Sequence, residues 1–150
     1  MMVFTVNRAK LIEIMNKTFG SCKYKLGAKP KVIYPPEKIK YSDCSGYVRY
    51  VLYHTVEPAI ILPSGSWYQE QWAIANLTPC QYSDASKLDS IVRIAFIGKA
   101  ARQNKPGHVW LIVNGRTVEC YGGVGAGRRE WDIPVLVERK PRCYIIGKLV

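Results

Sequence analysis

The stretch Asp43-Cys44-Ser45-Gly46-Tyr47-Val48 places a cysteine where a helix is expected to begin. The pattern that follows predicts a helix over 45–56, with one stripe formed by Val48, Val51, Leu52 and Thr55. Ser42 or Asp43 would cap this helix. A thiol at a helix start lies near unpaired backbone N–H groups and the positive end of the helix dipole, which favour the nucleophilic thiolate. Cysteine is also among the most buried residue types, so Cys44 could instead be a structural core residue.

A histidine opens the apolar run from Gly107 to Val113, and the turn after that run predicts where its side chain lies. Asn114-Gly115 between two apolar runs is typical of a two-residue β-hairpin. The resulting register puts His108 and Glu119 on the same face, with their backbones roughly 7–8 Å apart. That face comprises His108, Trp110, Ile112, Thr117, Glu119 and Tyr121. A carboxylate there could orient the imidazole and stabilise its charged form. Taken alone, Glu119 could equally be a solvated strand residue.

At these positions the chain resembles the NlpC-type cell-wall cysteine peptidases, a bacterial branch of the papain-like fold. Residues 43–48 match the Asp-Cys-Ser-Gly-aromatic-Val nucleophile motif, and residues 107–109 match the Gly-His-Val strand that carries the base. Residues 24–28 resemble an upstream Tyr-x-aromatic-Gly-Gly element, and residues 62–69 resemble a Leu-Pro-x-x-Ser-x-x-Gln segment. The resemblance extends over residues 24–125, which is most of the chain.

The resemblance implies an α+β, papain-like NlpC-type domain in which N-terminal helices, including the nucleophile helix, pack on a mostly antiparallel sheet. It implies catalysis without a cofactor, by Cys44 as nucleophile, His108 as base and Glu119 as third member. It also assigns substrate-binding roles to Tyr24, Asp43 and Ser45, with the last two meeting an amine or amide of the substrate. Tyr24 could instead be only a packed aromatic residue, and Asp43 only a helix cap.

Some positions depart from the family pattern. Leu26 and Ala28 replace its aromatic residue and second glycine, and Glu119 stands where a polar residue, often histidine, is usual. Asp89-Ser90 replaces the usual Gly-Asp before the central strand, and Gly98 to Pro106 is an insert before the histidine. These departures concern substrate recognition more than the type of reaction.

Length and composition predict one globular domain over residues 1–150, since 48% of the residues are hydrophobic and the chain is long enough for a sizeable core. The 22 basic and 11 acidic residues give a net charge of +11, which attracts polyanions. Nucleic acid is the first interpretation of such a charge. We nevertheless expect no nucleic-acid partner, because the basic residues are scattered and no recognised nucleic-acid-binding motif is present. Peptidoglycan carboxylates suit the same charge, and so does a merely soluble basic surface.

The sequence also bears on localisation. No run approaches the roughly 18 apolar residues that a membrane helix needs, so we expect no membrane span. Arg8 and Lys10 interrupt the N-terminal segment, and no small-residue cleavage site follows, which does not fit a secretory signal. We therefore expect synthesis in the cytoplasm without a signal peptide, or a mature form of a longer chain.

Besides Cys44 the chain has four cysteines, which could form two disulfides in any of three pairings or remain reduced: Cys22, Cys80, Cys120 and Cys143. Disulfides would suit a protein that acts in the periplasm. The hairpin register turns Cys120 away from the face of His108, so it is predicted to be structural. No His or Cys cluster has metal-ligand spacing, so no metal site is expected.

The expected order of elements begins with a helix over 7–19 whose inner face is Leu11, Ile12, Met15 and Phe19. The nucleophile helix and a third helix from Ser66 follow, the latter with a capping box formed by Ser66 and Gln69. Strands are expected at 91–97, 108–113, 116–121, near 133–137 and at 143–150. Gly122 to Gly127 is expected to be a flexible loop along the substrate groove. Helices first and then a mostly antiparallel sheet indicate an α+β fold.

Together these features favour an enzyme that cuts peptidoglycan stem peptides in the periplasm or cell wall, at the D-glutamyl–diamino acid bond that is typical of the resembled family. Small members without a signal resemble antibacterial effectors of type VI secretion machines, or phage lysis and tail enzymes. An effector would have a cognate immunity protein. Two alternatives remain: another acyl-transfer enzyme of this fold acting on lipids or as a transferase, and a non-catalytic basic binding module. Alkylation of Cys44 would abolish the activity of either enzyme but not of the module.

Overall fold

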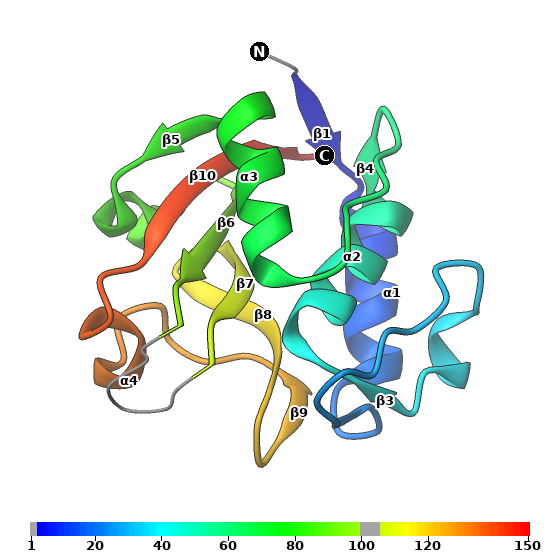
Figure 1. Ribbon diagram of the computed structural model, residues 1–150. Helices are drawn as coiled ribbons and strands as arrows, with labels where there is room; N and C mark the ends of the chain where they lie inside the picture. Colours follow the sequence, from blue (N-terminus) through cyan, green and yellow to red (C-terminus); the bar gives the residue numbers. More distant parts are fainter. Residues whose placement is uncertain (1–2, 100–105) are drawn as a thin grey trace.

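The computed structural model describes residues 3–99 and 106–150, so residues 100–105 of the predicted insert lie outside the described residues. One eight-stranded sheet has the order β4-β1-β10-β6-β7-β8-β9, with β5 pairing β10 (Figure 1). Its strands are β1 (Phe4–Val6), β4 (Val56–Glu57), β5 (Thr78–Cys80), β6 (Ile91–Ile97), β7 (His108–Val113), β8 (Arg116–Tyr121), β9 (Gly125–Gly127) and β10 (Arg142–Leu149). All neighbouring strands are antiparallel except β1 and β10. The predicted α+β class with a mostly antiparallel sheet is therefore confirmed.

The helices are α1 (Arg8–Thr18), α2 (Cys44–Thr55), α3 (Ser66–Asn76) and α4 (Pro134–Val137), with 3-10 turns at Pro36–Lys38 and Tyr82–Ser86. Two short parallel strands, β2 (Lys23–Tyr24) and β3 (Tyr41–Ser42), lead into α2. Helix α2 contacts α1 on one side and strands β7 and β8 on another, and α3 lies in front of the sheet (Figure 1). This arrangement places the start of α2 against the start of β7.

Helix α2 is the central helix of the fold, because α1, α3 and the strands β7 and β8 all pack against it. The predicted stripe of Val48, Val51, Leu52 and Thr55 is fully buried, as are the rings of Tyr47 and Tyr50. The helix begins one residue earlier than expected, and its cap is Asp43, whose side chain accepts a hydrogen bond from the backbone N–H of Gly46. A helix this deeply packed fixes the position of the residue at its first turn.

The inner face predicted for α1 is correct for Leu11, Met15 and Phe19, the last two partly buried against the core, and wrong for Ile12. Leu11 is buried as expected, but the other buried residues are Ile14 and Thr18, while Ile12 is 44% exposed. Thr18 faces α2, where its hydroxyl lies 2.7 Å from the hydroxyl of Tyr47. The inner face of α1 thus includes a polar residue that apolar spacing alone does not indicate.

The predicted capping box of α3 is also wrong. The N-cap is Gly65, with a φ of +93° and no side-chain hydrogen bond. Gln69 is instead fully buried, and its amide nitrogen donates to the carbonyl oxygens of Ser45 at 2.9 Å and Pro63 at 3.0 Å. A side chain that links α3 to α2 in this way is not available as a cap.

Two expectations near the C-terminus differ from the structure. The strand expected near residues 133–137 is the short helix α4, which Pro134 opens at its first position. The loop expected at Gly122 to Gly127 contains β9, which pairs with β8. A side chain at Gly125 would lie 2.2 Å from the carbonyl oxygen of Cys22, so only glycine lets β9 approach β2 this closely.

The hairpin of β7 and β8 has the predicted register, with Val113 opposite Arg116 and Ile112 opposite Thr117. Both turn residues, Asn114 and Gly115, have positive φ. Within residues 3–99 and 106–150, no helix has the length and apolar character needed to cross a membrane.

Candidate active site

The predicted nucleophile and base meet where α2 and β7 begin. Cys44 is the first residue of α2 and is 9% exposed, and His108 is the first residue of β7 with a side chain 15% exposed. The two side chains are close enough for the Cys44 thiol to raise the pKa of His108. The other end of the imidazole is engaged as well, since Nε2 lies 2.7 Å from Oε1 of Glu119. Nδ1 is therefore the nitrogen left for the thiol, and the three predicted catalytic residues form one continuous chain.

Glu119 is completely buried, and several donors hold its carboxylate. Arg129 donates from Nε and Nη2 at 2.9 and 2.7 Å, and the Thr117 hydroxyl donates at 2.5 Å. Burial alone would raise the pKa of Glu119, but the hydrogen bonds from His108 and Arg129 outweigh it and lower the pKa to about 2. The carboxylate is thus ionised at any pH at which the protein would act.

The charged form of His108 is favoured by its two neighbours. Burial lowers the pKa of His108, but the hydrogen bonds to Cys44 and Glu119 outweigh this effect, and the pKa is raised overall. The ring also stacks on the buried Trp110, with centroids 5.2 Å apart and planes at 22°. An imidazole held in this way can accept the thiol proton and keep its orientation.

The depressed pKa of Glu119 predicts a specific dependence of stability on pH. Its stabilising contribution is complete above the ordinary pKa of 4.5 and is lost as the pH falls toward about 2. Between pH 5 and pH 3, wild type should lose about 2 kcal/mol more of its free energy of unfolding than Glu119→Gln, which has no carboxylate to protonate. Urea denaturation of both proteins at each pH measures this difference. Parallel losses in the two proteins would contradict the predicted ionisation.

Arg129 is a site residue that the sequence interpretation missed. Besides holding Glu119, its guanidinium lies over the ring of Tyr121, 3.9 Å from the centroid. Two hydrogen bonds join residue 129 to Thr117: Thr117 N donates to the carbonyl oxygen of Arg129 at 2.8 Å, and Arg129 N donates to the side-chain hydroxyl of Thr117 at 2.7 Å. A basic pair at residues 128–129 was visible in the sequence, but no local pattern linked it to Glu119.

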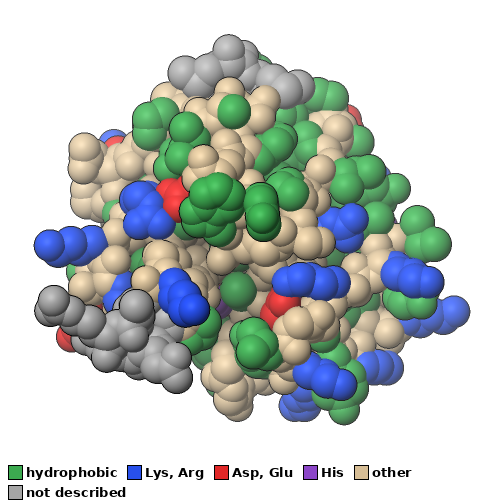
Figure 2. Space-filling model, viewed as in Figure 1, with side chains coloured by type: hydrophobic (Ala, Val, Ile, Leu, Met, Phe, Trp, Pro, Cys, Tyr) green, Lys and Arg blue, Asp and Glu red, His purple; other side chains and the backbone are tan. Residues whose placement is uncertain are grey.

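Tyr24 lies where the resemblance put it, beside the nucleophile. Strand β2 pairs with β3 so that Tyr24 is opposite Ser42, two residues before Cys44. Burial raises the pKa of the Tyr24 hydroxyl, and the charges of Cys44 and Asp43 add to this effect, which agrees with its closeness to both. Tyr24 and His108 line a pocket of about 310 Å³. Figure 2 shows a hollow in the lower middle of this face with a histidine side chain at its floor.

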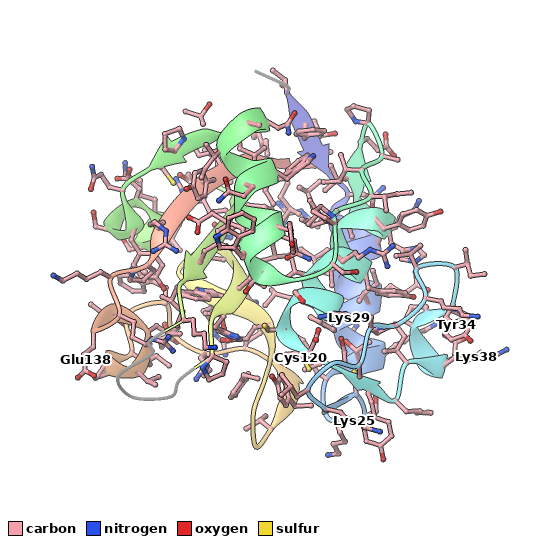
Figure 3. The ribbon with its side chains drawn as sticks, viewed as in Figure 1. Lys25, Lys29, Tyr34, Lys38, Cys120 and Glu138 are labelled. Carbon is pink, nitrogen blue, oxygen red and sulfur yellow. The ribbon has the colours of Figure 1, made fainter. Side chains whose placement is uncertain are left out.

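Asp43 and Ser45, the other two predicted substrate-binding residues, are almost fully buried and turn toward a third side chain. The ammonium of Lys29 contacts Oδ2 of Asp43 and donates to the Ser45 hydroxyl at 2.7 Å. The other carboxylate oxygen, Oδ1, caps α2 through Gly46 N at 2.7 Å. Figure 3 shows Lys29 close to the first turn of α2. The sequence interpretation missed Lys29, because it is far from Asp43 along the chain and in a loop.

The fold of this chain is similar to that of a solved structure. A solved structure from Staphylococcus aureus subsp. aureus Mu50, described as similar to a lipoprotein of the NLP/P60 family, superposes with a TM-score of 0.56. The match covers 95% of this chain and 40% of that chain, at 16% sequence identity. The chain has a papain-like, NlpC-type fold. At this identity the likeness establishes the fold alone, and the chain spans well under half the length of that protein.

No family model and no curated protein matches the chain. The predicted catalytic residues Cys44, His108 and Glu119 are brought together in this fold. Tyr24 lines the adjoining pocket, whereas Asp43 and Ser45 are turned to Lys29. The site can therefore transfer a proton from a thiol to a neutral, oriented imidazole beside an open pocket, and Glu119 stabilises the imidazolium that results.

Proposed function

We propose that this protein is a cysteine amidase that cuts the stem peptides of peptidoglycan. The observation that carries the proposal is the continuous chain from Cys44 through His108 to the buried, ionised Glu119. The NlpC-type fold supports the same conclusion, because a solved structure of that fold is described as a member of the NLP/P60 family. The D-glutamyl–diamino acid bond is the proposed site of cleavage.

In the proposed reaction, the Cys44 thiolate attacks the carbonyl carbon of the amide while its proton rests on His108. The backbone N–H groups in the first turn of α2 are the nearest donors for the oxyanion that develops. His108 then protonates the leaving amine, and the acyl group remains on sulfur as a thioester. Water attacks the thioester with His108 as base, and the free acid and the thiol are restored. Glu119 stabilises the imidazolium throughout through Nε2.

The charge of the protein supports an anionic substrate. The net charge is +11, and the pocket beside His108 is lined by Arg129 and Arg139, with no Asp or Glu among its lining residues in the described part of the chain. Stem peptides carry carboxylates that suit such a pocket. Delivery by a type VI secretion machine or by a phage, with action in the periplasm or cell wall, is part of the proposal. If the protein is a secreted antibacterial effector, the proposal includes a cognate immunity protein as its partner.

Digestion of purified sacculi tests the proposal directly. The wild-type protein should release new fragments whose masses identify the bond cut, and Cys44→Ala should release none. A second outcome would favour another acyl transfer: no muropeptide products, but acylation of Cys44 by thioester or lipid substrates. Unchanged sacculi and an unmodified Cys44 under all of these conditions would contradict both enzymes and favour the binding module.

Glu119→Gln should retain part of the activity. The amide keeps one hydrogen bond to the imidazole but loses the negative charge that stabilises the imidazolium, and it leaves Arg129 without its anionic partner. Initial rates of muropeptide cleavage, compared with wild type and Glu119→Ala, measure the effect. If Glu119→Ala were as active as wild type, Glu119 would have no catalytic role.

The variant Tyr24→Phe distinguishes between two roles of Tyr24, a catalytic role of its hydroxyl and a packing role of its ring. If the hydroxyl helps to bind the developing oxyanion, kcat should fall about tenfold or more, which corresponds to roughly 1.4 kcal/mol. The ring itself is kept, so the pocket wall and the pairing of β2 with β3 should not change. Equal kcat values for the two proteins would leave Tyr24 with a packing role only.

A further inference from the structure

The carboxylate nearest the nucleophile is already neutralised by this chain. Asp43 directly precedes Cys44, and its Oδ2 contacts the ammonium of Lys29, which also donates to Ser45 at 2.7 Å. Asp43 and Ser45 are buried, whereas the Lys29 side chain is 31% exposed. A substrate ammonium that approached Cys44 from this side would therefore meet another ammonium rather than a carboxylate.

The remaining buried carboxylates near the groove are paired in the same way. Glu119 is held by Arg129 at 2.7 Å, and Glu70, which lines the neighbouring pocket, is held by Arg142 at 2.6 Å. Arg139 differs, because its partners in the described part of the chain are the carbonyl oxygens of residues 98 and 106. Its positive charge faces the pocket beside His108 without a neutralising carboxylate there. Among residues 3–99 and 106–150, the surroundings of the nucleophile thus offer cations and no unpaired acid.

We propose that Lys29 sets the substrate specificity of this site. Its ammonium occupies the Asp43 carboxylate and the Ser45 hydroxyl, the polar groups on either side of Cys44 that would otherwise be free to bind a substrate amino group. The site therefore accepts acidic peptides whose amino end is blocked by an amide and rejects peptides with a free amino group there. In a cell wall, the first kind is a stem peptide still joined to its polymer, and the second is a released fragment. This inference rests on the proposed function.

Charged alkylating reagents report the field at Cys44 without any hydrolytic assay. Iodoacetate and iodoacetamide differ in charge but react with the same thiolate, and trypsin should release residues 41–49, which contain Cys44 as their one cysteine. The ratio of iodoacetate to iodoacetamide rates at Cys44 should fall about threefold or more in Lys29→Gln. Lys29→Arg should keep the ratio, because it keeps the charge.

Lys25→Gln is the matched control, since Lys25 lies in the same loop but its ammonium is over Tyr41, and Figure 3 shows it away from α2. The ratio should be unchanged in this variant. An equal ratio in wild type and Lys29→Gln would overturn the role of Lys29 while leaving Cys44 a reactive nucleophile. A Cys44 that reacts with neither reagent would overturn the proposed function, and this inference with it.

The substrate specificity can be measured with two muropeptides that are identical except that the amino end is acetylated in one and free in the other. Wild type should prefer the acetylated peptide in kcat/KM, mainly through a lower KM, and Lys29→Ala should reduce this preference about tenfold by accepting the free amine. A loss of kcat for both peptides without a change in preference would indicate a merely structural Lys29 and contradict the proposal.

A separate observation concerns the four cysteines outside the active site, which are free thiols in this structure but lie in two pairs. Cys80 on β5 is directly opposite Cys143 on β10 in an antiparallel pairing. Opposite residues in such a ladder have Cα atoms about 4.5–5.5 Å apart, within the range that a disulfide needs, about 4.4–6.8 Å.

The second pair is Cys22 and Cys120, which are both buried in the main core, where the neighbouring Cys22 thiol raises the pKa of the Cys120 thiol. The backbone agrees: the carbonyl oxygen of Cys22 accepts from Ala126 N at 2.9 Å, and Ala126 is the register partner of Cys120. Gly125 permits this close approach of β2 to β9. Of the three pairings open to four cysteines, the structure brings together only this one, Cys22 with Cys120 and Cys80 with Cys143.

We infer that both pairs are disulfide sites, closed when the protein folds in an oxidising compartment. Each closure joins two sulfur atoms and releases two protons and two electrons, which a small disulfide such as oxidised glutathione accepts as it becomes two thiols. Cys44 stays a thiol, because its partner is His108. Stabilisation without any effect on the nucleophile is the expected result.

Refolding of the reduced chain in a glutathione redox buffer, followed by tryptic mass mapping without reduction, tests the pairing. Residues 18–23 should be linked to 117–128, and residues 50–87 to 143–148. Cys80→Ser should leave the first link intact, and the urea midpoint of wild type should fall on reduction. A different pairing, a link to Cys44, or four free thiols after refolding would overturn the inference.

Discussion

His108→Ala is expected to lower kcat/KM for muropeptide cleavage by about a thousandfold, because a positioned general base contributes roughly 10²–10⁴ to such a rate. Among the described residues, the imidazole of His108 is the basic group that lies between Cys44 and Glu119, so we expect no neighbour to take over proton transfer. The fold should survive, since the side chain lies at the pocket and is partly exposed at the first residue of β7. Circular dichroism and the urea midpoint check the fold, and initial rates give the loss.

Cys44→Ala is the reference for this loss, and the double variant Cys44→Ala/His108→Ala should be no less active than either single one. Residues that act as one catalytic unit show such non-additive effects. Alkylation adds an independent reading: iodoacetamide should label Cys44 more slowly in His108→Ala, because the imidazolium that stabilises the thiolate is gone. A variant that kept more than a tenth of the wild-type rate would remove His108 from the reaction.

The part of the site that could be predicted from the sequence is the part set by local rules. The turn at Asn114-Gly115 determines the register of its hairpin, and that register alone places His108 and Glu119 together. Likewise, a polar cap followed by a regular apolar stripe defines the start of α2 at Cys44. Both features depend on residues close together in the chain.

Lys29 and Arg129 could not be predicted, because their partners depend on tertiary contacts. Lys29 reaches Asp43 only because β2 and β3 pair and bring its loop against α2. Arg129 reaches Glu119 only because the chain after β9 returns along β8. Neither pairing follows from a period of apolar residues or from a turn.

The errors in secondary structure have two origins. Gln69 has the spacing of a capping residue, but its side chain is buried and its amide nitrogen donates to the carbonyl oxygens of Ser45 and Pro63. The apolar run from residue 133 has the composition of a strand, yet Pro134 suits the first turn of a helix. At Gln69 tertiary context overrides a weak local preference, whereas at Pro134 one local signal outweighs another.

Compartment-specific toxicity is the second large effect expected of a cell-wall amidase. Expression of the chain behind a periplasmic export signal should lyse a Gram-negative host, because the stem peptides lie outside the inner membrane, and hydrolysis by Cys44 and His108 would weaken the sacculus. Cytoplasmic expression of the same chain should be tolerated. Optical density and viable counts after induction measure the effect, and mass spectrometry of the recovered sacculi identifies the cut.

Two variants make this outcome specific to the chemistry. Cys44→Ala should be harmless in both compartments, since it lacks the nucleophile but keeps the net charge of +11, which excludes toxicity from a basic surface alone. Lys25→Gln should remain fully toxic, because Lys25 lies outside the site. Equal toxicity from the cytoplasm, with no new muropeptide fragments, would contradict the cell-wall target. It would instead point to an intracellular amide or thioester, because only those substrates would require the same cysteine on the other side of the membrane.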